Sequence, residues 1–166
     1  GTPDIRNIRY ANPDSVMLTL DKALKNATDY RLSIENISDI FGNPIAATDT
    51  TITFYEVSAA DSGDVFVNEF NYEPSSGNTE YIELNNPTDR SFNLQNWTLA
   101  DNRGAANIIT NSQYIIPPDS FVVVASDNTL LSNYPDISLI PMSSFPSLNN
   151  SGDDIVLKNA RGTRLD

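Results

Sequence analysis

Three glutamates in the middle of the chain are the side chains best suited to chemistry. A pair of carboxylates could supply general acid–base catalysis, and Glu69, Glu80 and Glu83 are the candidates. Glu80 and Glu83 are three residues apart in a strand-like segment, so we expect them on opposite faces, where they cannot converge. Glu69 could approach one of them from a neighbouring strand. The alternative is that these carboxylates hydrogen-bond to loops or solvent, and we predict no catalytic residue.

The chain contains no histidine and no cysteine. It therefore lacks the commonest general base, the commonest transition-metal ligand and the Ser-His-Asp triad. Disulfides, thiol nucleophiles and cysteine-type zinc sites are excluded as well. We predict that the chain is not an enzyme and binds no cofactor.

Calcium is the metal that the composition favours most, because oxygen ligands are abundant. The candidate pairs are Asp101 with Asn102, Asp127 with Asn128, and Asp153 with Asp154. None of them fits the calcium loop of an EF-hand. Asp and Asn are also ordinary turn residues, since their side chains bond to nearby backbone groups. We assign no metal ligand, and calcium in one of these loops is left as the alternative.

The net charge of −12, from 22 acidic and 10 basic residues, limits the partners of the chain. Nucleic-acid binding depends on clustered Lys and Arg, so we predict none. The same charge disfavours anionic lipid surfaces. No segment approaches the 18 or more apolar residues of a membrane span, and we expect no membrane insertion.

The 166 residues are polar but weakly charged, with 19% charged and 39% hydrophobic side chains and many Asn, Ser and Thr. Such surfaces are common in extracellular β-modules, so we expect an extracellular, cell-surface or periplasmic location. The length allows one large domain or two small ones.

Alternation of apolar and polar residues predicts strands through the first part of the chain. Tyr30, Leu32 and Ile34 share one face of a strand over 29–35, and similar patterns occur at 16–21 and 51–55. Periodicity is lost near 57–63. We therefore predict a first domain over 1–57, a linker over 58–62 and a second domain over 63–166.

Short apolar strands separated by Pro, Gly, Asn or Ser clusters predict a β-sandwich or barrel for the second domain. We expect one short helical turn within 126–134. The predicted strands are 65–70, 81–85, 92–99, 108–109, 114–116, 121–125 and 155–157.

Five motifs in this half are similar, in content and order, to those of lamin tail domains. They are an opening strand ending in Asn68-Glu69-Phe70, a second strand, a Trp-bearing strand, a Pro-rich turn into a buried strand, and a Leu-x-Asn-x-Gly-Asp-type segment. They occupy 63–70, 80–86, 94–99, 116–123 and 148–157. Residues 63–166 therefore resemble a lamin tail domain.

The resemblance implies an immunoglobulin-like β-sandwich that serves as an interaction module. Bacterial modules of this kind are appended to larger secreted proteins, often hydrolases or adhesins. Trp97, the only tryptophan, is expected in the sandwich core. The alternative is that Trp97 is an exposed platform on which a ligand stacks.

Residues 2–57 resemble the latter half of a bacterial Ig-like domain. The pattern Tyr-x-Leu-x-Ile at 30–34, then Asp39-x-x-Gly-Asn-Pro, then a final strand at 51–54 is similar to that family's closing pattern. Its leading strands are expected to be missing, and Gly162–Asp166 reaches a turn after which lamin tail domains normally add a strand. We therefore expect open sheet edges and self-association through them.

The sequence thus predicts an all-β protein, a partial Ig-like module followed by a lamin-tail-like sandwich. We expect a non-catalytic structural or interaction module of a secreted or surface multidomain bacterial protein, with a protein or cell-surface polymer as its partner. The first alternative is a carbohydrate-binding accessory module, and the second is a fragment of an enzyme whose catalytic domain lies elsewhere. In the carbohydrate alternative the stacking residues would be Tyr72, Tyr81, Tyr114 or Tyr134.

Overall fold

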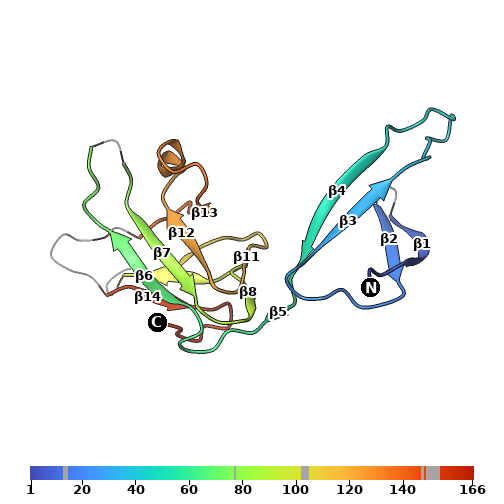
Figure 1. The fold of residues 1–166 in the computed structure, drawn as a ribbon. Coiled ribbons are helices and arrows are strands. Elements are labelled where there is room, and N and C mark those ends of the chain that lie inside the picture. Colours follow the sequence, from blue (N-terminus) through green and yellow to red (C-terminus); the bar gives the residue numbers. More distant parts are fainter. Residues whose placement is uncertain (13–14, 77, 102–104, 147, 149–153) are drawn as a thin grey trace. The chain divides into compact units, whose positions relative to one another are not determined.

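The computed structural model describes residues 1–12, 15–76, 78–101, 105–146, 148 and 154–166 (Figure 1). The chain divides into two compact units, Gly1–Glu56 and Val57–Asp166. Strands dominate both units, and the helical residues form one short 3₁₀ turn, η1 (Thr129–Ser132), in the part that is described. Within the same residues, no helix has the length and apolar character needed to cross a bilayer.

The first unit consists of two antiparallel hairpins. β1 (Ile5–Asn12) pairs with β2 (Ser15–Leu20), and β3 (Thr28–Ile34) pairs with β4 (Thr48–Phe54). The alternation in the sequence accounts for the second hairpin, because it places Tyr30 of β3 directly opposite Ile52 of β4. The strand-rich structure is consistent with an Ig-like module.

Large apolar side chains of the first unit remain open to solvent. None of its described residues is buried, and Ile8 and Tyr10 of β1 are 62% and 86% exposed. Each hairpin is a separate two-stranded sheet, so its outer backbone groups are unpaired within the sheet. A two-stranded hairpin alone is marginally stable in water, and these faces are suited to contact with further protein surface.

The second unit is an Ig-like β-sandwich built from three sheets. The four-stranded sheet has the order β13-β12-β7-β6, and the two three-stranded sheets have the orders β11-β8-β5 and β10-β9-β14. β12 pairs with β7 in antiparallel register and with β13 in parallel register. The strands are β5 (Val57–Ser58), β6 (Phe66–Asn71), β7 (Tyr81–Asn86), β8 (Ser91–Asn93), β9 (Thr98–Ala100), β10 (Asn107–Ile108), β11 (Ile115–Ile116), β12 (Ser120–Ala125), β13 (Leu139–Pro141) and β14 (Val156–Lys158).

Residues 58–62, which the sequence assigned to a linker, contribute to the second unit. Ser58 lies in β5 and pairs with Phe92 of β8, and Ala60 is buried in the core. The Asn159 side chain donates a 2.8 Å hydrogen bond from Nδ2 to the carbonyl oxygen of Ala60. Small residues without periodicity are typical of linkers, but here they allow the backbone to pack closely against the sandwich.

One continuous core joins the inner faces of the three sheets. Ile82 and Leu84 of β7 are fully buried and belong to the same cluster as Phe92 of β8 and Leu157 of β14. Trp97 is only 4% exposed, and its ring centroid lies 6.5 Å from that of Phe92. The prediction of a core tryptophan is confirmed. The alternative, that Trp97 is an exposed platform for a ligand, is wrong because the side chain is buried.

The strand predicted over 92–99 is divided into two. Asn96 adopts a positive φ of 61°, and the Trp97 amide donates to the Leu94 carbonyl oxygen at 3.0 Å. This turn separates β8 from β9 and places them in different sheets. The short strand β13 was not predicted, whereas the helical turn expected within 126–134 is present as η1.

Replacing Trp97 with Ala should lower the free energy of unfolding of the second unit by about 3–5 kcal/mol, because it leaves a cavity beside Phe92. Urea titration followed by circular dichroism measures the loss. Phe121→Ala is the matched control, since Phe121 is 49% exposed and its loss should change stability by less than about 0.5 kcal/mol. Equal melting of Trp97→Ala and the parent would contradict the core assignment.

Candidate functional site

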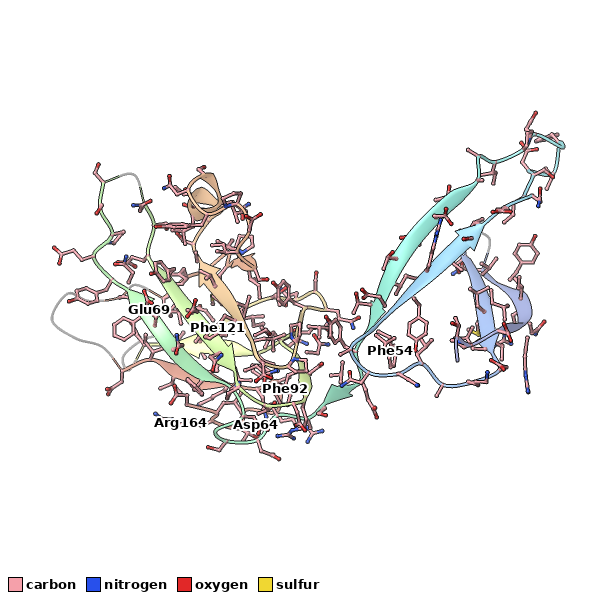
Figure 2. The ribbon with its side chains drawn as sticks, in the orientation of Figure 1. Phe54, Asp64, Glu69, Phe92, Phe121 and Arg164 are labelled. Carbon is pink, nitrogen blue, oxygen red and sulfur yellow. The ribbon has the colours of Figure 1, made fainter. Side chains whose placement is uncertain are left out.

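The candidate site lies on the outer face of the four-stranded sheet, opposite the core. Side chains alternate along a strand, so the burial of Ile82 and Leu84 directs Tyr81 and Glu83 of β7 outward. Glu69 on β6 and Phe121 on β12 belong to the same face and can be followed in Figure 2. We call this surface the outer face.

Strand register arranges the outer face in three rows, each crossing β6, β7 and β12. An amide lies between two phenylalanines in the first row, two carboxylates lie beside a valine in the second, and a tyrosine lies between small or polar residues in the third. The rows are Phe66–Asn85–Phe121, Glu69–Glu83–Val123 and Asn71–Tyr81–Ala125.

The meeting of Glu69 and Glu83 depends on an irregularity in β6. The register shifts between Val67 and Glu69, which inserts one extra residue, Asn68. Without this shift, Glu69 would not lie directly opposite Glu83. The Asn68 side chain also reaches Glu83, donating from Nδ2 to Oε1 at 2.7 Å.

Among the described residues, no cation forms an ion pair with either carboxylate. Glu69 accepts a 2.5 Å hydrogen bond from the Tyr81 hydroxyl, and Glu83 accepts one from the Asn68 side chain, and both donors are neutral. The ion pairs among the described residues lie elsewhere, as in Arg90 with Asp64. Like charges directly opposite each other across a strand pair are destabilising. The sheet therefore carries two acidic residues at directly opposite positions on its outer face.

A cavity of about 230 Å³ opens beside Glu83, and Glu69 is not part of its lining. One wall is apolar, formed by Val123 and by Leu130 of η1, and two tyrosines and several amide or hydroxyl groups complete it. The lining residues are Asn71, Asn78, Thr79, Tyr81, Glu83, Val123, Leu130, Tyr134 and Ile137. Tyr81 and Ile137 also pack against the small cluster formed by Val123, Ala125 and Leu130.

The electrostatic environment of Tyr81 reflects the nearby negative charge. The hydrogen bond to Glu69, partial burial and the charges of Glu69 and Glu83 raise the pKa of Tyr81 to about 12. A hydrogen bond from a neutral phenol to a carboxylate stabilises the protonated phenol, and the adjacent charges oppose phenolate formation. Tyr81 is therefore a neutral donor at physiological pH.

The remaining predicted residues do not join this site. Glu80 precedes β7, and its Oε2 accepts a long 3.5 Å hydrogen bond from the Leu148 amide. Tyr72 is 39% exposed and its ring centroid lies 6.2 Å from that of Phe70. Tyr114 is half-buried and packs against the main core. The cavity thus brings together Glu83, Tyr81 and Tyr134 and leaves the other candidates apart.

Of the residues considered as calcium ligands, Asp127 has a structural role and two others lie outside the described residues. Asp127 Oδ1 accepts a 2.8 Å hydrogen bond from the Thr129 amide at the start of η1, and the bonds from Thr129 lower the pKa of Asp127. Asn102 and Asp153 lie outside the described residues. Within the part of the chain that is described, no three acidic residues are grouped closely enough to hold a metal ion.

Sequence reasoning missed the apolar wall and the amides of the cavity. Leu130 and Ile137 are brought to the sheet by η1 and by the unpredicted strand β13. Asn78 and Thr79 come from the connection between β6 and β7. The helical turn expected within 126–134 was the one available signal that a segment would cover this part of the sheet.

The family model of the lamin tail domain matches residues 58–166, and the chain belongs to this family. The match covers the whole sandwich apart from Val57. Lamin tail domains are Ig-like modules that are generally non-catalytic. No curated protein matches the chain.

Substituting Glu69 with Gln should lower the pKa of Tyr81 from about 12 toward its ordinary value of 10.0, because one charge and a charge-assisted hydrogen bond are lost. The absorbance of phenolate during an alkaline titration reports this change, and Tyr81→Phe identifies the signal.

The sign of the linked stability follows from the raised pKa. Tyr81 makes its full contribution to the free energy of unfolding below pH 10.0, where its phenol is protonated in both the folded and the unfolded chain. This contribution is lost as the pH rises to about 12. Unchanged titration in Glu69→Gln would contradict the hydrogen-bond assignment.

Proposed function

We propose that the chain is a non-catalytic interaction module of a secreted or surface-displayed multidomain bacterial protein, and that the outer face contacts a protein partner. The observation that carries the proposal is the Glu69–Glu83 pair, which forms no ion pair with a cation among the described residues and lies beside exposed Phe121. A stable sandwich has no structural need for this arrangement. Residues that weaken a fold locally are often retained for function.

The outer face offers two kinds of contact at a fixed spacing. Phe66 and Phe121 flank Asn85 in one row, and the carboxylates occupy the next. Successive outward residues of a strand are about 7 Å apart, so an apolar and a basic side chain of one partner segment could engage both rows. Exposed aromatic residues such as Phe121 are typical of protein interfaces.

Charge supports a protein partner over nucleic acid. Residues 57–166 include 14 acidic and 5 basic residues, a net charge of −9. Phosphate backbones would be repelled, whereas basic protein segments would be attracted over a longer range. The polar, weakly charged composition of the whole chain supports the extracellular, cell-surface or periplasmic location.

A carbohydrate-binding accessory role is the second candidate. Tyr81 and Tyr134 line one cavity together with Asn71 and Asn78, and aromatic rings beside amides suit a sugar. The apolar wall from Leu130 and Ile137 favours a more apolar ligand. We therefore keep this function as the alternative outcome of the test.

Contact between copies of the chain is a further part of the proposal. The exposed apolar side chains of the first unit and the open edges of its two hairpins support it. Light scattering over a range of concentrations measures it directly.

Retention of the labelled chain on intact cells of the source organism tests the proposed function. We expect Phe121→Ser and Glu83→Lys to reduce retention by about tenfold, the loss expected for one well-placed interface residue. Ile40→Ser is the matched control, because Ile40 is 93% exposed but belongs to the first unit.

Treating the cells with protease beforehand should abolish retention. Retention that survives protease and is displaced by soluble sugars would support the carbohydrate-binding alternative. Equal retention of all variants would contradict the assignment of the outer face.

A further inference from the structure

The cavity beside Glu83 has a chemistry that identifies one type of ligand. Val123, Leu130 and Ile137 contribute apolar groups to its lining, and Glu83, the two tyrosines and several amides or hydroxyls contribute polar ones. A ligand that fits both must have an apolar body and a polar, positively charged end. At about 230 Å³ the cavity is smaller than typical small-molecule sites of roughly 300–1,000 Å³, so it suits a single side chain.

We propose that this cavity binds the side chain of a lysine presented by a protein partner. The proposal rests on the proposed function and names the group that the outer face recognises. The four-carbon stem of lysine would pack against Leu130 and Ile137, and its ammonium group would approach Glu83. Tyr81 and Tyr134 add aromatic faces that attract a cation.

The hydrogen bonds of Glu83 favour lysine over arginine. Glu83 Oε1 already accepts from Asn68 Nδ2 at 2.7 Å, so a guanidinium bound to both oxygens would have to share Oε1 with Asn68, whereas an ammonium group can use Oε2 alone. A guanidinium pairs best with a carboxylate through two parallel bonds, whereas an ammonium is a point charge that needs one oxygen.

The nearby charge favours a cation over a neutral ligand. Glu69 lies directly opposite Glu83 on the adjacent strand, and it accepts a hydrogen bond from the neutral Tyr81 hydroxyl. A cation between or beside these carboxylates would relieve their mutual repulsion, which a neutral sugar would not do.

Titration of the full chain with Nα-acetyl-lysine methylamide, followed by heteronuclear NMR, tests the proposal. We expect saturable shifts at residues around the cavity, at millimolar ligand and low salt, that weaken as salt is added. The uncharged isostere Nα-acetyl-norleucine methylamide should produce no such shifts. Glu83→Gln should weaken binding of the lysine derivative by about tenfold, as expected for a hydrogen bond to a charged group. Asp89→Asn removes an exposed carboxylate outside the cavity and should leave binding unchanged.

Three outcomes would overturn the proposal. They are equal shifts with the norleucine derivative, unchanged affinity in Glu83→Gln, and tighter binding of an arginine derivative or of methyl glucosaminide than of the lysine derivative. The proposed function is judged separately by cell retention. If retention depends on Phe121 and Glu83 while the lysine derivative fails to bind, the ligand assignment fails and the contact surface remains. If the lysine derivative binds but the chain is not retained on cells, the proposed function fails and the ligand assignment remains.

Discussion

Alternation of side chains along β7 connects the core of the sandwich to its outer face. Ile82 and Leu84 are fully buried between the sheets, and this fixes Tyr81 and Glu83 on the opposite side. A slip of one residue would place a carboxylate in the core and two large apolar side chains in solvent. The register of β7 with β6 and β12 is therefore strongly specified, and the arrangement of the rows on the outer face follows from it.

The outer face carries a charge arrangement that the core does not require. The extra residue in β6 brings Glu69 opposite Glu83, and the two carboxylates accept hydrogen bonds from neutral donors, Tyr81 and Asn68. Most buried polar side chains elsewhere in the second unit have hydrogen-bond partners, and the Ser91 hydroxyl is the exception among the described residues. Asn86, for example, is fully buried and donates from Nδ2 to the carbonyl oxygen of Pro117 at 2.6 Å. The contrast supports a role for the carboxylates in recognition, since a binding partner can supply the positive charge that the sheet lacks.

The sequence predicted the parts of this fold that depend on local patterns. Alternation identified the strand around Tyr30, short apolar segments between turn residues identified the strands around Ile82 and Val122, and the family motifs predicted the sandwich and its core tryptophan. The cavity was harder to predict from the sequence, because β13 pairs with β12 in parallel and brings Ile137 to Tyr81 from a distant part of the chain. Periodicity in one segment carries no information about which strand becomes its neighbour. The approach of Glu69 to a carboxylate on the adjacent strand was foreseen, but the register shift that sets it opposite Glu83 has no clear sequence signal.

We propose that the Glu69–Glu83 pair lowers the stability of the second unit and is retained because it binds a partner. The free energy of unfolding of Glu69→Gln, Glu83→Gln and the double variant tests it most directly, because glutamine retains a hydrogen-bond acceptor and removes only the charge. At low salt each single variant should be more stable than the parent by about 0.2–1 kcal/mol, and the second substitution should add little. High salt should reduce the gain. Single variants that are less stable than the parent at every salt concentration would contradict the account.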